Sequence, residues 1–164
     1  MTSKNAAIVG IACLALAGGI WLVFSPGPSD QEQIKEALAK SIKASREGRP
    51  GGVLELLSSN FKVNNTEYST SSTNFTNAIR NYKPDLKVAN TTPAISGDQA
   101  TIISDVTLDA SILSMHKTVD IPQATFTFHK ESGTKWGLIP SKDWKLDQVT
   151  IPQSSVDQVM AQFQ

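Results

Sequence analysis

Residues 124–139 read ATFTFHKESGTKWGLI, and this stretch decides the fold class of a chain of 164 residues. Its first apolar residues alternate with threonine, which is the period of a strand with one buried face. These residues are Ala124, Phe126 and Phe128. The sequence Ser132-Gly133-Thr134 is typical of a turn, so we expect it to join a strand over 117–130 to a strand over 135–146. The stretch predicts an antiparallel hairpin with one apolar and one polar surface.

The same period of two extends upstream. From Ala100 to Ala110, small or apolar residues occupy every second position and mostly polar residues lie between them. The turn-forming sequence Ser96-Gly97-Asp98 predicts that a further strand over 86–95 precedes this long one. We therefore expect an antiparallel sheet whose apolar surface is covered by helices.

A first helix is predicted to begin at Ser29. The spacing of Ser29 and Glu32 is that of a capping box, in which two side chains satisfy backbone amides at a helix start. Apolar residues then recur every three or four positions, until Gly48 and Pro50 end the helix. This pattern indicates an amphipathic helix that packs on the sheet.

Further helices are expected before and after the predicted strands in the sequence. A short second helix is predicted over 52–59, with Phe61 just beyond it as a core side chain, and a third over 73–83. Residues 64–72 are rich in Ser, Thr and Asn, so we expect them to form a mobile loop. Residues 153–164 are expected to form a last short helix, capped by Ser155, that docks on the domain or frays.

The amino-terminal segment is expected to cross a membrane. Residues 6–24 carry no charge, and as a helix they would be about 28 Å long, close to the hydrocarbon thickness of a bilayer. Lys4 precedes them and Asp30 is the first charge after them, which places the short tail in the cytoplasm and the remainder outside it. We expect a single-pass protein of the cell membrane with an extracytoplasmic domain.

Two other readings of this segment stay open at the level of the sequence. A cleaved secretory signal would need small residues after the apolar run, where the chain has Ser25-Pro26-Gly27-Pro28. A lipoprotein signal would need an aliphatic residue three positions before Cys13, where the chain has Gly10. The anchor is favoured over both. The expected organisation is a tail (1–5), a membrane span (6–24), a stalk (25–28), a folded domain (29–152) and a C-terminal helix or tail (153–164).

Composition excludes several classes of function. The chain has 15 basic and 15 acidic residues and no basic run, so it lacks the electrostatic signature of a nucleic-acid-binding protein. Its single cysteine, Cys13, allows neither an internal disulfide nor a cysteine metal site. The histidines His116 and His129 have no accompanying ligand cluster, so we expect no metal and no cofactor.

Three segments carry a resemblance to a known family: IKEALAKSIKASREGRPGGVLELLSSNF at 34–61, SGDQATIISDVTL at 96–108, and Phe126-Thr127-Phe128 leading through Gly133 to Trp136. In this order and spacing, residues 29–149 resemble the nuclear transport factor 2-like superfamily, which includes ketosteroid isomerases. The resemblance implies an α+β cone with a pocket between helices and a curved sheet, and homodimers through the outer surface of that sheet. It leaves the activity open, because the superfamily contains isomerases, dehydratases, transport factors and anchored assembly domains.

The expected pocket is mostly apolar. Its predicted lining residues are Phe75, Tyr82, Phe126, Phe128 and Trp136. Such a wall favours a non-catalytic binding or assembly role, with a small apolar ligand or a hydrophobic side chain of a protein partner as occupant. The alternative is a small-molecule isomerase or dehydratase, which needs an acid and a base in the pocket.

The strand periodicity bears on that alternative. Counting by two from Val106 places Asp105 and Asp109 on the outer surface, and counting from Phe126 places His129 there. An enzyme would use Tyr82 as the proton donor and Asp105 or Asp109 as the base, which requires a shifted register. We therefore expect that the chain is not an enzyme.

Overall fold

The computed structural model describes residues 27–70, 72–112, 115–135 and 139–162. The predicted membrane span (6–24) and Trp136 lie outside these ranges. Within them, no helix is both long and apolar enough to span a bilayer. The elements are α2 (Asp30–Arg46), α3 (Pro50–Leu54), β1 (Leu57–Val63), β2 (Thr66–Glu67), α4 (Thr73–Tyr82), β3 (Asp85–Val88), β4 (Ala94–Ser96), β5 (Gln99–Ile112), β6 (Met115–Lys135), β7 (Ile139–Thr150) and α5 (Gln153–Gln162).

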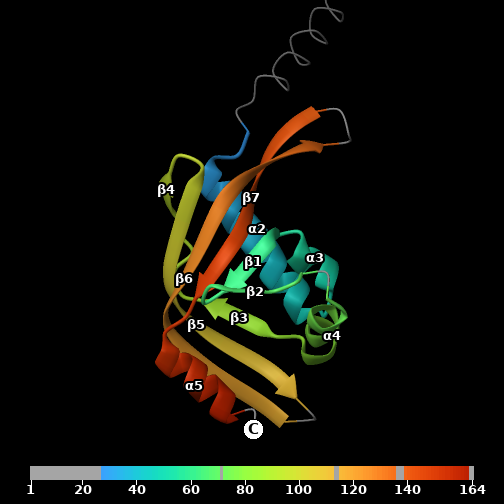
Figure 1. Ribbon diagram of the computed structural model, residues 1–164, viewed down its shortest axis with the longest axis vertical. Coiled ribbons are helices and arrows are strands. Elements are labelled where there is room, and N and C mark those ends of the chain that lie inside the picture. The colour runs from blue at the N-terminus through green and yellow to red at the C-terminus, as the bar shows by residue number, and fades with distance from the viewer. Residues whose placement is uncertain (1–26, 71, 113–114, 136–138, 163–164) are drawn as a thin grey trace, which may run out of the picture.

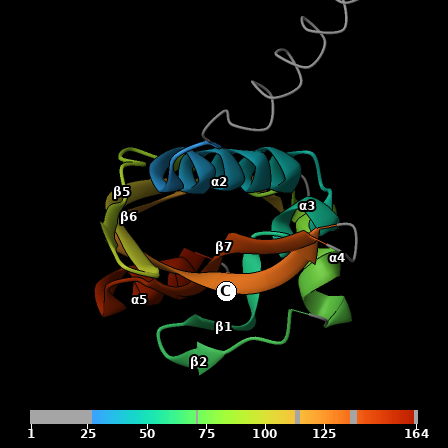
Figure 2. The same ribbon diagram turned by 90° about the horizontal axis from the view of Figure 1, so that it is seen from above.

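One curved sheet forms the body of the domain. Its strand order is β2-β1-β7-β6-β5-β3, with β4 paired to β5 beside β3. All pairs are antiparallel except β1 with β7. Seen from above, the sheet curls around α2, which lies across its concave side (Figures 1 and 2). The α+β class and the helix-covered antiparallel hairpins predicted from the sequence are confirmed.

Helix α2 begins and ends where the sequence predicts. The Ser29 side chain accepts a hydrogen bond from the Glu32 amide, and the Glu32 side chain accepts one from the Ser29 amide. Near the other end, Gly48 has a φ of +67°, and a Cβ there would lie 3.2 Å from the Arg80 carbonyl oxygen. Ile34, Leu38 and Ala44 form the buried face of the helix. The capping box and the amphipathic pattern are thus confirmed.

The predicted helix over 52–59 is wrong. Only Pro50–Leu54 is helical, and β1 already begins at Leu57. The Leu56 carbonyl accepts a hydrogen bond of 2.7 Å from the Leu146 amide, so the chain here completes the edge of β7. A short apolar run is compatible with either a helix or a strand. Here it forms a strand because it pairs with the free edge of β7. Phe61 is buried as predicted, but within β1.

The segment predicted as a mobile loop, 64–72, contains a hairpin instead. Asn64 and Asn65 both have positive φ, 48° and 64°, and they connect β1 to the short strand β2. Asparagine tolerates this left-handed conformation better than most residues. The Asn64 side chain also accepts a hydrogen bond of 2.8 Å from the Ile151 amide, which fixes the turn to the end of β7.

Two other boundaries differ from prediction. The strand expected over 86–95 is divided into β3 and β4, because the chain leaves the sheet at Asn90, whose amide donates to the buried Ser104 hydroxyl. Ser132-Gly133-Thr134 is not a turn, since Gly133 pairs with Ser141 inside the ladder of β6 and β7. The ladder continues to the pair of Lys135 with Ile139, so β6 is longer than expected and β7 begins and ends four residues later than expected.

A bulge divides β6 into two halves. Between the pairs Ser104–Ala124 and Val106–Ile121, β6 contains one residue more than β5. Gln123 takes a positive φ of 50° there, and its amide donates a hydrogen bond of 2.9 Å to the Asp105 carboxylate. On the C-terminal side of the bulge the even-numbered residues Ala124, Phe126 and Phe128 of β6 face inward. On its N-terminal side the odd-numbered Ile121 and Val119 face inward.

The core lies between α2 and the concave side of the sheet. Its most deeply buried large side chains are Phe128, Ile34, Ile102 and Val119. At the other end of the chain, α5 packs against β6 and buries Ser155 to 2% exposure. The last helix therefore docks, which is one of its two predicted states, but it begins at Gln153, so Ser155 lies inside the helix and the prediction that it caps the helix is wrong.

Candidate functional site

A cavity of about 450 Å³ lies between the helices and the concave side of the sheet. It is surrounded by α2, the α3–β1 segment, α4 and strands β3, β5, β6 and β7. Residues that line it include Leu38, Ser41, Ser45, Leu56, Phe61, Phe75, Ile79, Leu86, Val106, Leu108, Phe126, Leu146 and Val149. We call it the inner cavity.

A second hollow, the outer groove, lies between α4 and β5. It has a volume of about 490 Å³ and is lined by Phe75, Ala78, Ile79, Tyr82, Pro84, Leu108 and Ala110. Four residues, Phe75, Ile79, Pro84 and Leu108, line both hollows. The inner cavity and the outer groove are therefore adjacent compartments that share a wall.

The wall of the inner cavity is almost entirely hydrocarbon. Among the residues that line it, only Ser41 and Ser45 have polar side chains, and none carries a charge. The Ser45 hydroxyl donates a hydrogen bond of 2.6 Å to the Pro84 carbonyl, which ties α2 to the end of α4. Such a cavity favours apolar occupants, because a polar group placed in it would lose its water without gaining a partner.

The structure describes four of the five predicted pocket residues, and it places them in different environments. Phe75 lines both compartments and Phe126 lines the inner cavity. Tyr82 lines the outer groove with 44% of its surface exposed. Phe128 is completely buried, but it packs in the core cluster and does not line a compartment. Trp136 lies outside the described residues.

Most of the lining comes from residues that sequence reasoning did not single out. Leu38 and Ser41 belong to α2, and their positions follow from the apolar stripe of that helix. Val106 and Leu108 follow from the alternation in β5. The signal for these faces was present in the sequence, but the position of the hollow between them was not.

The carboxylates considered for catalysis lie on the other side of the sheet. Asp105 is exposed and holds the β6 bulge through the Gln123 amide. Asp109 accepts hydrogen bonds from Lys87 at 2.8 Å and from Thr118 at 2.6 Å. The hydrogen bond that Lys87 donates to Asp109 raises the pKa of Lys87. Both carboxylates have structural partners, and neither lines the inner cavity or the outer groove.

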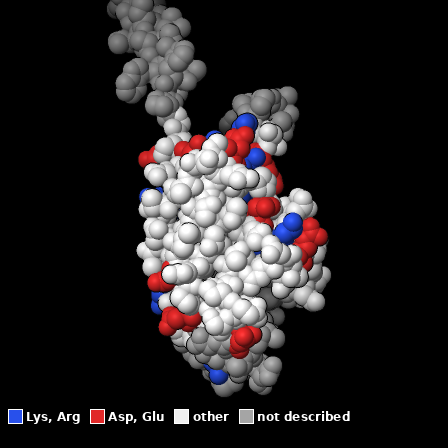
Figure 3. Space-filling model, turned by 60° about the vertical axis from the view of Figure 1, so that its left-hand side comes forward, with Lys and Arg blue, Asp and Glu red and all other residues white. Residues whose placement is uncertain are grey.

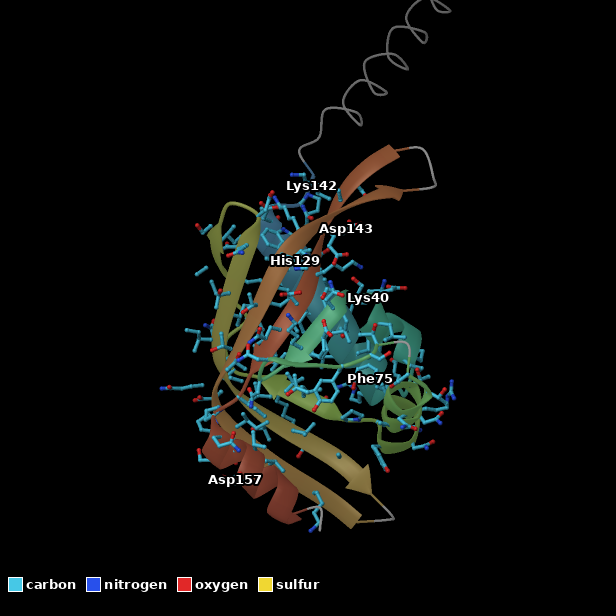
Figure 4. The ribbon with its side chains drawn as sticks, in the orientation of Figure 1. Lys40, Phe75, His129, Lys142, Asp143 and Asp157 are labelled. Carbon is cyan, nitrogen blue, oxygen red and sulfur yellow. The ribbon has the colours of Figure 1, made fainter. Side chains whose placement is uncertain are left out.

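His129 also belongs to the outer surface. Its Nε2 lies 3.1 Å from Glu131, and its Nδ1 lies 3.6 Å from Asp147, which accepts a hydrogen bond from the buried Ser58 hydroxyl. Figure 4 labels His129 on β6, well above Phe75 on α4. Within the described ranges, no three potential metal ligands gather closely enough to hold an ion.

The end of the domain nearest residue 27 is closed by a polar cluster. Asp30 of α2 accepts hydrogen bonds from the Lys130 ammonium at 2.8 Å and from the Trp144 indole at 3.1 Å. The ammonium also lies 5.1 Å from the centre of the Trp144 ring, a cation–π contact. The bond from Lys130, followed by that from Trp144, lowers the pKa of the Asp30 carboxyl.

We call this cluster, with Phe128 beside it on β6, the closed end. The region around Phe75, Tyr82 and Leu108 is the hollow end. The two lie apart along the long axis of the domain, with the closed end at the top of Figure 1 and α4 lower down at the right. A hollow of about 640 Å³ also lies at the closed end, but its lining includes the charged residues Glu36, Lys40, Lys142 and Asp143, whereas the inner cavity and the outer groove have no charged lining residue.

No family model and no curated protein matches the sequence. Solved structures do match the fold. An NTF2-like protein of unknown function in nutrient uptake from Rhodospirillum rubrum has a TM-score of 0.56 at 15% identity, covering 75% of this chain and 97% of that one. An NTF2-like superfamily protein from Salmonella enterica has a TM-score of 0.55 at 15% identity, covering 74% and 89%.

The CaMKII hub of S. rosetta is similar to the same degree. It has a TM-score of 0.53 at 15% identity, covering 77% of this chain and 98% of the hub. At such identities the likeness concerns the fold alone. The domain therefore has the nuclear transport factor 2-like fold that the sequence resemblance implied.

Proposed function

We propose that this chain is a membrane-tethered, non-catalytic binding domain whose inner cavity holds a small apolar ligand or a hydrophobic side chain of a protein partner. The observation that carries the proposal is the cavity of about 450 Å³ with two serine hydroxyls and no charge among its lining residues. A volume of this size is in the range of small-molecule sites. A hollow in the core lowers stability, so its presence supports a use for it.

The chemistry of the wall argues for binding over catalysis. An isomerase or dehydratase needs an acid and a base that both reach the substrate. Tyr82 stands at the rim of the outer groove, whereas Asp105 and Asp109 have partners on the opposite side of the sheet. The described lining therefore offers no base to act together with Tyr82.

The inner cavity can be tested by plugging the wall that it shares with the outer groove. The full chain in lipid nanodiscs would be examined by native mass spectrometry after release from the membrane. We expect a co-purifying molecule on the wild type and its loss in Leu108→Trp, since Leu108 lines both compartments. Ala39→Trp, at an exposed position of α2, is the matched control and should retain it. A wild-type chain that carries neither a ligand nor a partner would contradict the proposal.

The tether is the second part of the proposal, and it is supported by the uncharged run at 6–24. We propose that the N-terminus is cytoplasmic and that the folded domain is extracytoplasmic. The test uses a Cys13→Ser background with one new cysteine, Ser59→Cys, at an exposed position of β1. A membrane-impermeant maleimide should label this cysteine on intact cells. Labelling only after lysis would contradict the topology, and recovery of the protein in the soluble fraction would contradict the tether.

A homodimer through the outer face of the sheet is the third part. Charged residues are sparse over the centre of the face that Figure 3 presents, where β5 and β6 lie. Ile103 on β5 is 59% exposed and Ile95 on β4 is 37% exposed. The likeness in fold to a CaMKII hub and to a putative CaMKII association domain from Xanthomonas campestris supports an assembly role. We expect Ile103→Glu to halve the mass of the particle in light scattering, whereas Lys35→Glu on α2 should leave it unchanged.

A further inference from the structure

We infer that the occupant of the cavity is a single-chain amphiphile with an anionic head group, its alkyl chain in the inner cavity and its head at the end of the outer groove beside Lys117. This inference rests on the proposed function, because it assumes that the cavity binds a ligand, and it names the chemical class of that ligand. It follows from the order of the compartments and from the charge at one end of them.

In the proposed binding mode the ligand occupies both compartments. The inner cavity and the outer groove share Phe75, Ile79, Pro84 and Leu108, so they are adjacent, and an alkyl chain that passes between these side chains would reach from the first into the second. Every other residue that lines the outer groove is apolar except Tyr82, whose hydroxyl is the one polar side-chain group there. A path with this lining fits a flexible hydrocarbon chain better than a compact polar molecule, because each buried methylene contributes to binding.

The orientation of the ligand's alkyl chain follows from the difference between the two ends of the domain. The closed end is occupied by Asp30, Lys130 and Trp144, which already satisfy one another. The inner cavity offers an anionic head no cation, and of its two serine hydroxyls, Ser41 and Ser45, the second is already bonded to the Pro84 carbonyl. The head must therefore remain at the outer groove, near water.

A cation lies where the groove ends. Ala110, which lines the outer groove, is the direct cross-strand partner of Lys117 on β6. Opposite residues of an antiparallel pair project from the same face of the sheet, so Lys117 projects on the groove side. The acidic groups nearby, Asp109 with its partner Thr118, project from the other face.

Lys117 is half-buried and has no hydrogen bond or ion pair with any described residue. Lys87 and Lys130, by contrast, are each bonded to a carboxylate. A lysine without a carboxylate at the end of an apolar path provides charge complementarity for an anionic head, either carboxylate or phosphate. It gives no advantage to an uncharged amphiphile of the same length.

The experiment uses the full chain in nanodiscs and three twelve-carbon probes that carry a diazirine at the chain end: dodecanoate, dodecyl phosphate and dodecanol. Photo-crosslinks from the chain end should map by mass spectrometry to inner-cavity residues such as Leu38 or Phe126. We expect the two anionic probes to reach half-maximal crosslinking at several-fold lower concentration than dodecanol. Tighter binding of dodecanoate than of dodecyl phosphate indicates that the natural ligand is a fatty acid. Tighter binding of dodecyl phosphate indicates a ligand derived from a phospholipid.

Charge variants then test the head-group site. Lys117→Gln and Lys117→Glu should weaken the anionic probes by roughly three- to tenfold, the range of a partly exposed ion pair and its reversal, and leave dodecanol unchanged. Lys35→Glu, the same charge change on α2 at the other end of the domain, should have no effect. Each methylene removed from the chain should weaken binding by about fourfold.

Two results would overturn the inference. One is equal crosslinking by all three probes with no effect of the Lys117 variants, which would leave a binding cavity without head-group recognition. The other is crosslinking that never maps to inner-cavity residues. Either result is distinct from failure of the proposed function, which is decided by the co-purifying molecule and by Leu108→Trp.

Discussion

The closed end and the hollow end use the same sheet and the same helix in opposite ways. At the closed end, Asp30, Lys130 and Trp144 are joined by hydrogen bonds and a cation–π contact. At the hollow end, Phe75 and Leu108 stand around empty volume. From this difference we expect side chains at the closed end to contribute more to the stability of the domain than those at the hollow end.

Two phenylalanines give the largest expected contrast. Phe128→Ala removes a fully buried ring from the packed region and should lower the free energy of unfolding by about 3–5 kcal/mol. Phe75→Ala removes a ring that is only half-buried beside an existing hollow, so the loss should be about 1 kcal/mol. Urea denaturation of both variants, followed by circular dichroism, measures the difference. Equal losses would mean that the two ends are equally well packed.

Filling the hollow is the second test. Ser41→Leu adds hydrocarbon to the inner cavity from α2 and replaces serine by a better helix former, so unfolding should cost about 1 kcal/mol more. The same variant should lose the co-purifying ligand in native mass spectrometry. Ser45→Leu is the matched control, since it also adds volume but removes the hydrogen bond to the Pro84 carbonyl, and it should be destabilising.

The closed end should respond to acid. The hydrogen bond from Lys130 lowers the pKa of Asp30, so its stabilising effect is complete above the unfolded-state pKa of about 4 and is lost as the pH falls through the lower folded-state pKa. Asp30→Asn should therefore flatten the dependence of stability on pH between about 5 and 2. Because the Asp30 side chain is 36% exposed, the effect should be at most about 1 kcal/mol. Identical acid transitions for the variant and the wild type would contradict this role of the cluster.

The smallest effect is expected at the rim of the hollow end. Tyr82 is 44% exposed, and no described residue forms a hydrogen bond with its hydroxyl, so Tyr82→Phe should change stability by less than about 0.5 kcal/mol. It should also leave the amount of bound ligand in native mass spectrometry unchanged. A conversion of the bound molecule that stops in Tyr82→Phe would instead revive the isomerase or dehydratase alternative.

Much of the fold could be predicted because it depends on local periodicity. The alternation in Ala100 to Ala110 and the spacing of Ser29 and Glu32 are short-range patterns that the structure retains. The predictions that are wrong concern choices made by distant residues. Leu57 is in a strand because the edge of β7 lies next to it, and Gly133 continues a ladder because Ser141 lies opposite.

The candidate site shows the same limit more sharply. Phe126 and Phe128 both belong to the buried core and lie on one face of one strand, yet only Phe126 lines the inner cavity. Which of them meets empty space depends on how α2 and α4 lie over the sheet. Sequence patterns specify which face is buried, but the volume left between two buried faces is a property of the assembled domain.

The bulge at Gln123 has a consequence for how the chain tolerates change. A strand has two phases, and this single inserted residue switches β6 from one phase to the other halfway along its length. A strand of the same length without the bulge would turn Thr118 and Asp120 toward the core in place of Val119 and Ile121, whereas deleting Pro122 or Gln123 would remove the extra residue and leave Val119 and Ile121 facing inward in regular alternation. Loss of one of these two residues should therefore be tolerated better than loss of one residue elsewhere in β6, which would turn the apolar side chains on one side of the deletion away from the core.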